Sequence, residues 1–131
     1  MSAIPKDRFY TASHEWIRID GGKASVGITD HAQHELGDLV FADPAPVGKK
    51  LAAGDSVATL ESVKAASDAY APVAGTVSVS NRALYDDPAL LNTDPYGQPL
   101  VVLDLDAGAD AAATPGLLDA DAYGTLVGGK G

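Results

Sequence analysis

Short runs of β-forming residues separated by turn residues restrict this chain to an antiparallel, mainly β fold. The runs at residues 14–19 and 23–28 flank Asp20-Gly21-Gly22, a sequence typical of a hairpin turn. Strands this short, connected through turns, build a sandwich or a flattened barrel. The remaining strands are expected at residues 39–42, 56–61, 69–71, 75–80 and 100–105.

Short helical segments interrupt these strands. Asp30 is expected to cap a first helix, with Gln33 in the capping-box position and Gly37 at its end. Residues 87–91 predict one helical turn with proline at its first position. Residues 119–128 predict a last helix that begins at an aspartate cap and stops at two glycines.

The number of large apolar side chains limits how many hydrophobic cores the chain can form. The hydrophobic share is 46%, but 23 of these residues are Ala, and Leu, Val, Ile and Phe together number only 30 of 131. That share lies just above the ~20% below which a core becomes doubtful. We therefore expect one compact core and a single domain over residues 1–131.

The charge is strongly acidic, with 9 basic and 18 acidic residues and a net charge of −9. Residues 83–129 contain eight Asp and no Lys or Arg. Such a surface repels phosphate backbones and anionic lipids, so we expect neither a nucleic-acid partner nor a membrane partner. Steering toward a basic partner and an ordinary solubilising surface both remain open.

Targeting signals and cysteines are absent from the sequence. Residues 1–7 have no apolar run for secretion and no Arg-rich stretch for an organelle. The absence of Cys excludes disulfides, thiolate metal sites and a protein thiol nucleophile. We expect a cytoplasmic monomer.

Three groups of residues resemble functional sites, but each lacks a feature that its site requires. His31 and His34 lie on one expected helix, but no third metal ligand is identifiable nearby. The neighbours Ser13-His14-Glu15 point to alternate faces of a strand and form no local relay. The aspartates of residues 104–110 lack the glycine and glutamate that a calcium loop requires. We expect no metal site and no catalytic residue.

Lys64 lies near the tip of an expected hairpin. Apolar strand residues lead up to it, and a second strand returns after it. The neighbours of Lys64 are small or apolar and offer its charge no partner. A protruding amine on a tight turn suits covalent modification by an enzyme that engulfs it. An ordinary solvated lysine is the alternative interpretation.

The segments on both sides of Lys64 resemble biotinyl and lipoyl domains. Residues 47–57 contain a Gly-Asp turn before the hairpin, and residues 71–77 follow the pattern Ala-Pro-x-x-Gly-x-Val after it. Biotinyl domains place Met on both sides of the lysine, and acyltransferase lipoyl domains place Asp before it. Glu61-Ser62-Val63-Lys64-Ala65 instead resembles the glycine cleavage system H proteins.

This resemblance continues in family order over about residues 8 to 105, and residues 119–123 resemble the final helix of the family. After Tyr96-Gly97 the chain departs from the family, since Gln98-Pro99-Leu100 replaces a Gly-Trp pair. The resemblance implies a mainly β fold of the lipoyl/biotinyl type, a flattened barrel of two antiparallel sheets. A few short helices are expected, one near residues 30–36 and one at the C-terminus. The chain would be one lipoyl-carrier domain with N- and C-terminal extensions packed on it. The matching segments are residues 13–17, 26–33, 36–41 and 92–97.

The implied function is that of a carrier rather than an enzyme. Lys64 would bear lipoic acid as an amide, within a tip formed by Glu61, Ser62, Val63 and Ala65. A lipoate ligase or lipoyl transferase would attach it. The arm would take the aminomethyl group of glycine from the pyridoxal-phosphate glycine decarboxylase (P-protein) to the tetrahydrofolate-dependent aminomethyltransferase (T-protein). Dihydrolipoamide dehydrogenase (L-protein) would then re-oxidise the arm.

The resemblance also implies a cleft that shields the loaded arm from water. The positions that line it match Ser13, Glu15 and Asp68. Ser13 and Glu15 are expected on one strand, where a two-residue spacing points both side chains to one face. Two carboxylates and a hydroxyl suit a cationic amine, although plain surface polarity is the alternative. Glu35 occupies a position that is His in some members of the family.

Two rival functions remain open at this point. One is a lipoyl relay, in which the protein donates lipoate to other lipoate-dependent dehydrogenases. The other is an unmodified interaction module that keeps the same fold, against which the intact Glu61–Ala65 segment argues.

Overall fold

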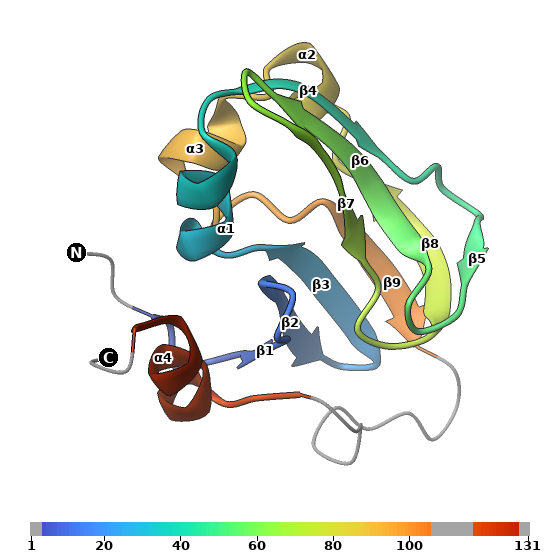
Figure 1. Cartoon of the computed structure of the whole chain (residues 1–131). Helices are drawn as coiled ribbons and strands as arrows, with labels where there is room; N and C mark the ends of the chain where they lie inside the picture. Colours follow the sequence, from blue (N-terminus) through green and yellow to red (C-terminus); the bar gives the residue numbers. More distant parts are fainter. Residues whose placement is uncertain (1–3, 106–116, 129–131) are drawn as a thin grey trace.

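A computed structural model describes residues 4–105 and 117–128 and contains two antiparallel sheets (Figure 1). The larger sheet has the strand order β1-β2-β3-β9-β8-β5, and the smaller has the order β4-β6-β7. The strands of the larger sheet are β1 (Phe9–Tyr10), β2 (Glu15–Asp20), β3 (Lys23–Ile28), β9 (Val101–Leu105), β8 (Gly75–Ser80) and β5 (Lys50–Leu51). Those of the smaller are β4 (Leu39–Pro44), β6 (Ser56–Ser62) and β7 (Ala66–Tyr70).

In the described part of the chain, four short helices lie around the sheets. They are α1 (Asp30–Leu36), α2 (Ala83–Asp86), α3 (Leu90–Thr93) and α4 (Ala120–Gly128). Figure 1 shows α1 and α3 beside each other at one end of the layered sheets, and α4 against β1. None of the helices in the described part of the chain is long and apolar enough to span a membrane.

The mainly β class and the two antiparallel sheets confirm the sequence prediction, but the sheets do not close into a barrel. Among the described residues, no strand of one sheet is paired with a strand of the other. The smaller sheet therefore keeps β4 and β7 as edges, and the larger keeps β1 and β5. β5 contributes only two paired residues, and β4 ends at Pro44, which has no N–H to donate to a neighbouring strand.

Side chains between the sheets form the main core. The larger sheet contributes Ile17, Val26 and Leu103 to it, and the smaller contributes Leu60 and Ala69. All five are buried. Because no backbone ladder joins the two sheets, this packing fixes their relative position, and with it the position of the β6–β7 hairpin.

A second, aromatic cluster lies under α4. The ring of Tyr10 stacks on that of Tyr123, with 4.7 Å between centroids. The buried Trp16 indole donates a hydrogen bond to the Pro95 carbonyl (3.1 Å). Asp119 accepts a hydrogen bond from the Ala122 amide (2.8 Å), so the predicted cap of the last helix is confirmed. This cluster binds the C-terminal helix to the larger sheet.

The structure corrects two details of the helix predictions. Thr29, not Asp30, caps α1, because its hydroxyl accepts a hydrogen bond from the Ala32 amide (3.1 Å). In place of the one helical turn expected at residues 87–91, the structure has two short helices, α2 ending at Asp86 and α3 beginning at Leu90. Pro88 lies in the turn between these helices and is not the first residue of one.

Gly75 has a different role from the one expected for a turn glycine. It lies at the start of β8 opposite Leu105, and its φ angle is not in the left-handed region. A Cβ atom here would lie 2.7 Å from the backbone oxygen of Asp104. The glycine is therefore needed for the close approach of β8 to β9. Gly54, in the turn before β6, does have a positive φ of 93°.

Replacing Gly75 by valine is expected to lower the free energy of unfolding by about 1–3 kcal/mol, because the new side chain clashes with backbone atoms of β9. Thr76→Val is the matched control on the same strand and is expected to change it by less than about 0.5 kcal/mol. Urea unfolding followed by circular dichroism measures both. Equal stabilities of the two variants would contradict the steric explanation.

Candidate functional site

The tip of the β6–β7 hairpin is a tight turn fixed by Ser62. The Ser62 amide donates to the Ala65 carbonyl (2.8 Å). The Ser62 hydroxyl accepts from the amides of Lys64 (3.2 Å) and Ala65 (3.1 Å). These bonds start β7 at Ala66, three residues earlier than the sequence predicted. Ser62 thus fixes the backbone on both sides of Lys64.

Lys64 projects from this turn with an exposed side chain. Within the described residues its amine has no hydrogen-bond or ion-pair partner. The turn is held against the end of α1, since the Val63 amide donates to the Asp38 carbonyl (3.1 Å). Gly37 lies beside the lysine, where a Cβ atom would come within 3.2 Å of the Lys64 Cε. The Lys64 amine is therefore unpaired in this part of the chain, and the turn that carries it is held in place by hydrogen bonds.

Of the other predicted tip residues, Glu61 and Ala65 are exposed and Val63 is 68% exposed. Glu61 pairs with Phe41 of β4 and with Ala66 of β7, so it lies in the ladder just before the turn. The structure therefore places the predicted tip residues at or next to the turn that carries Lys64. The spacing of the strands predicted this turn, and the family resemblance named its residues.

A pocket of about 160 Å³ lies between the start of β2, α1 and the β6–β7 hairpin. The three predicted cleft residues, Ser13, Glu15 and Asp68, all line it. His14, Glu35 and Ser67 add further polar groups, and the apolar wall consists of Ile28, Ala32, Leu36, Leu60 and Ala69. This is a small, mostly apolar pocket with polar groups on one side.

Glu15 is buried in this pocket, with 3% of its surface exposed. Its Oε1 accepts from the hydroxyls of Thr11 and Ser13, both at 2.6 Å. Among the described residues, its Oε2 accepts a single long bond, from the Tyr70 amide (3.3 Å). A carboxylate has about four acceptor positions, so Oε2 keeps capacity for a further donor. Glu15 also links β2 of the larger sheet to β7 of the smaller.

The positions of Ser13 and Asp68 differ from the expected ones. Ser13 lies in a turn before β2, because β2 begins at Glu15 and His14 has a positive φ of 72°. Its hydroxyl reaches Glu15 through this turn and not through a strand repeat. Asp68 lies on β7 because that strand begins before the expected residue 69, and it pairs with the exposed Thr59, whereas its neighbour Ser67 pairs with the buried Leu60. Asp68 therefore lies at the rim of the pocket.

His14 lines the pocket and is held from behind by His31 of α1 and Tyr123 of α4. The His14 ring lies 4.5 Å from that of His31, and its Nδ1 is 2.9 Å from the Tyr123 hydroxyl. Burial and the neighbouring His31 lower the pKa of His14 below its usual value. Burial raises the pKa of Tyr123 to about 12. His14 was considered only as part of a triad in the sequence, and its role in the wall depends on α1 and α4.

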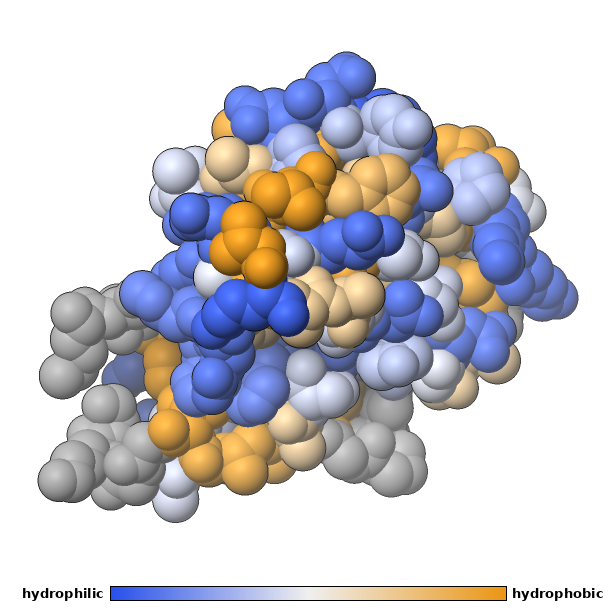
Figure 2. Space-filling model, turned by 45° about the horizontal axis from the view of Figure 1, so that its top comes forward, coloured by the Kyte–Doolittle hydropathy of each residue, from blue (hydrophilic) through white to orange (hydrophobic). Residues whose placement is uncertain are grey.

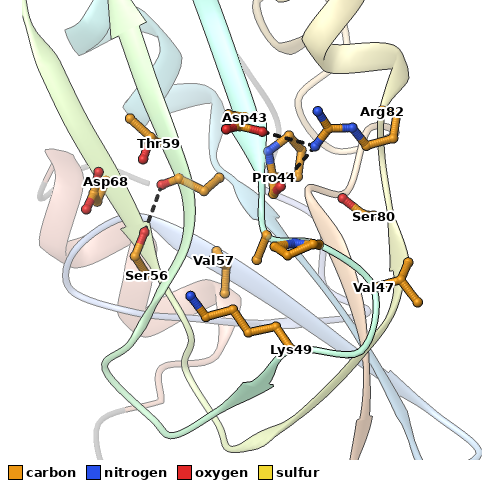
Figure 3. A pocket seen from close by; sticks show the side chains of 13 residues that line it. Asp43, Pro44, Val47, Lys49, Ser56, Val57, Thr59, Asp68, Ser80 and Arg82 are labelled. Carbon is orange, nitrogen blue, oxygen red and sulfur yellow. Dashed lines mark hydrogen bonds and ion pairs between the residues drawn. The ribbon is translucent and has the colours of Figure 1, made fainter.

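Asp68 also borders a second, larger groove of about 700 Å³ on the outer side of the smaller sheet. Figure 3 shows Asp68 at the same end of this groove as Ser56 and Thr59. At the other end, the Arg82 guanidinium donates to Asp43 (3.0 Å) and to the Pro44 carbonyl (3.1 Å). No sequence motif indicated this groove.

The described residues contain no group of three side chains suited to a metal ion. Instead, the Nε2 atom of His31 lies 3.3 Å from Oε1 of Glu35, and the Nε2 atom of His34 lies 3.4 Å from Oδ2 of Asp30. Most of the calcium-like segment at residues 104–110 lies outside the described residues.

Glu15→Ala is expected to lower the free energy of unfolding by about 2–3 kcal/mol, because three donors lose their charged acceptor in a buried place. Asp68→Ala removes an exposed carboxylate and is expected to change it by less than about 0.5 kcal/mol. Urea unfolding compares them. Equal effects would show that Glu15 is not a structural link.

His14 is expected to make stability fall as the pH drops below about 6.5. The unfolded chain protonates its histidine at this usual pKa, whereas the folded protein does so only at lower pH, so protons favour unfolding in that window. His14→Asn keeps a residue that tolerates positive φ and should flatten the dependence of thermal midpoint on pH between 5 and 7. Parallel curves for the parent and the His14→Asn variant would refute this.

Comparisons with known proteins agree with these features. The family model described as "Glycine cleavage H-protein" matches residues 8–128. A glycine cleavage system H protein from Halorhodospira halophila is 48% identical over the whole of both chains. The H protein from Burkholderia ambifaria is 51% identical, covering 97% of this chain and 99% of that one.

A solved structure supports the same conclusion. The crystal structure of a glycine cleavage system H protein from Mycobacterium marinum is 42% identical and superposes with a TM-score of 0.79. The match covers 92% of this chain and 95% of that one. With its two unclosed sheets and a lysine at the hairpin tip, the chain belongs to the glycine cleavage H-protein family.

Proposed function

We propose that this protein is a non-catalytic, cytoplasmic carrier of the glycine cleavage system whose arm is a lipoyl group on Lys64. The observation that carries the proposal is the unpaired, exposed amine of Lys64 on a turn fixed by Ser62. Membership of the H-protein family supports the carrier role. The same family supports the partners, namely the P-, T- and L-proteins and a lipoate-attaching enzyme.

The geometry of the tip fits amide formation. The neutral amine of Lys64 can attack the carbonyl carbon of an activated lipoate, forming the C–N bond. The leaving group departs with the bonding electrons, and the proton of the nitrogen passes to water. The amine needs no internal ion pair to be broken first, because none of the described residues pairs with it. Lys23, by contrast, is paired with Asp104.

When bound, the lipoyl group would supply a dithiolane able to take up the aminomethyl unit of glycine together with the electron pair that stays behind when the carboxyl group leaves as carbon dioxide. The protein itself presents the lipoyl-bearing lysine to the enzymes and protects the loaded arm from water. The β6–β7 turn orients the lysine, and its contact with residues 37–38 limits the directions in which the side chain can leave the surface.

We further propose that the 160 Å³ pocket shelters the amine-bearing end of the arm. Its apolar wall excludes water, and Oε2 of Glu15 has room for an additional donor. Asp68 at the rim contributes a second negative charge that attracts an ammonium group. Ser13 contributes by orienting Glu15, since its hydroxyl donates to Oε1 (2.6 Å).

Lys64→Arg is expected to abolish lipoylation completely, because the guanidinium cannot form the amide. Intact mass and peptide mapping of protein purified from cells supplied with lipoate measure the modification. Lys49→Arg, an exposed lysine away from the tip, is the matched control and should be lipoylated as the parent is. A lipoyl group on any other lysine, or none on the parent, would overturn the proposed function.

A further inference from the structure

We propose that an exposed apolar patch beside Lys64 is the docking surface for the enzyme that attaches lipoate, and that the matching surface of that enzyme is apolar with a basic rim. We call it the tip patch and define it as Val40, Phe41, Val63 and Tyr85. This inference rests on the proposed function and adds to it the surface that a partner uses.

The tip patch is unusually exposed for apolar side chains. Val63 is 68% exposed, Val40 is 58% and Tyr85 is 49%. These residues come from three different elements, the hairpin turn, β4 and α2. Figure 2 shows a group of apolar side chains, bordered by hydrophilic ones, on the face that contains the top of Figure 1. Contiguous exposed apolar surface in a small protein marks an interaction site.

A β-bulge turns Val40 outward. Leu39 pairs with Ser62 and Phe41 pairs with Glu61, so Val40 has no partner in the ladder between them. A β-bulge changes the direction in which a side chain points, and it is a specific feature of a strand rather than a defect. Because Leu39 pairs at the end of β6, the bulge places Val40 directly beside the turn that carries Val63 and Lys64. The Val63 amide bond to Asp38 (3.1 Å) keeps these two segments together.

The far end of the tip patch is braced. The Phe41 ring meets the Tyr85 ring edge-on, with 5.7 Å between centroids. The Arg82 guanidinium lies over the Tyr85 ring at 4.9 Å and also binds Asp43 (3.0 Å). An ordered apolar surface loses little conformational entropy on binding, so it favours docking.

The chemistry of attachment selects the partner. For the enzyme that forms the amide, the reacting atom is the Lys64 amine itself, so its surface must contact the residues next to that lysine. Enzymes that act on the dithiolane meet it at the far end of a long arm and can approach from farther away. A patch that begins at Val63, one residue from the reacting amine, is therefore placed for the attaching enzyme.

The charges around the tip patch indicate which charges the enzyme carries at the edge of its docking surface. Glu61, Asp38, Asp86 and Asp87 are exposed carboxylates in the same segments as the patch residues. Arg82 is paired with Asp43, and Lys64 is itself the group that enters the active site of the enzyme. The surroundings are thus acidic, and complementarity requires basic side chains on the enzyme.

The test measures lipoylation rates of the purified apo-protein with a purified lipoate ligase at several protein concentrations. Val40→Ser combined with Val63→Ser should raise KM roughly tenfold or more while changing kcat less than about twofold, since burial of the two side chains is lost. Val47→Ser combined with Val79→Ser is the matched control, because these valines are 64% and 52% exposed and lie elsewhere. Added salt should raise the KM of the parent.

Two further measurements keep the result interpretable. Thermal midpoints of both double variants must match the parent, and Val63→Ile, which keeps the apolar surface, should retain the parent KM. Equal KM values for the tip-patch and control variants would overturn the inference, as would a defect with the glycine decarboxylase but not with the ligase. A parent protein that no ligase modifies would instead overturn the proposed function itself.

Discussion

Side-chain packing between two unclosed sheets is the interaction on which the rest of the structure depends. The β6–β7 hairpin belongs to the three-stranded sheet, which shares no ladder with the six-stranded one among the described residues. Leu60 and Ala69 of the hairpin are buried against the larger sheet. The Glu15 carboxylate adds a polar link by accepting from the Tyr70 amide (3.3 Å). The position of Lys64 relative to the pocket follows from this packing.

The same hairpin serves two proposed purposes on opposite sides. Its tip presents Lys64 and the tip patch to an enzyme that must reach the amine. Its inner face, with Leu60 and Ala69, forms part of the apolar wall of the pocket that we propose for the loaded arm. A rigid turn suits both purposes, because in a flexible tip the distance between Lys64 and the pocket would vary. The hydrogen bonds of Ser62 provide that rigidity.

Local sequence signals predicted the elements that depend on local chemistry. The β2–β3 hairpin has the expected bounds within one residue, because Gly21 and Gly22 adopt the positive φ angles that its turn needs. The strand at residues 75–80 and the cap at Asp119 were also predicted. The errors lie where tertiary contacts decide. For example, α2 carries no cap signal, and its buried Leu84 holds it against the core.

The sequence by itself determined the mainly β class and the position of Lys64 near a hairpin tip, because turn chemistry acts over a few neighbouring residues. It also named Ser13, Glu15 and Asp68, although only through resemblance to a family. The resemblance also predicted one cleft for the three, but only the tertiary structure decided that Glu15 is already bound by Thr11 and Ser13 and that Asp68 lies at the rim. It also decided that Val40 faces outward beside the lysine. The reason is that pocket walls and exposed patches form between elements far apart in the chain, whose distances no local pattern encodes.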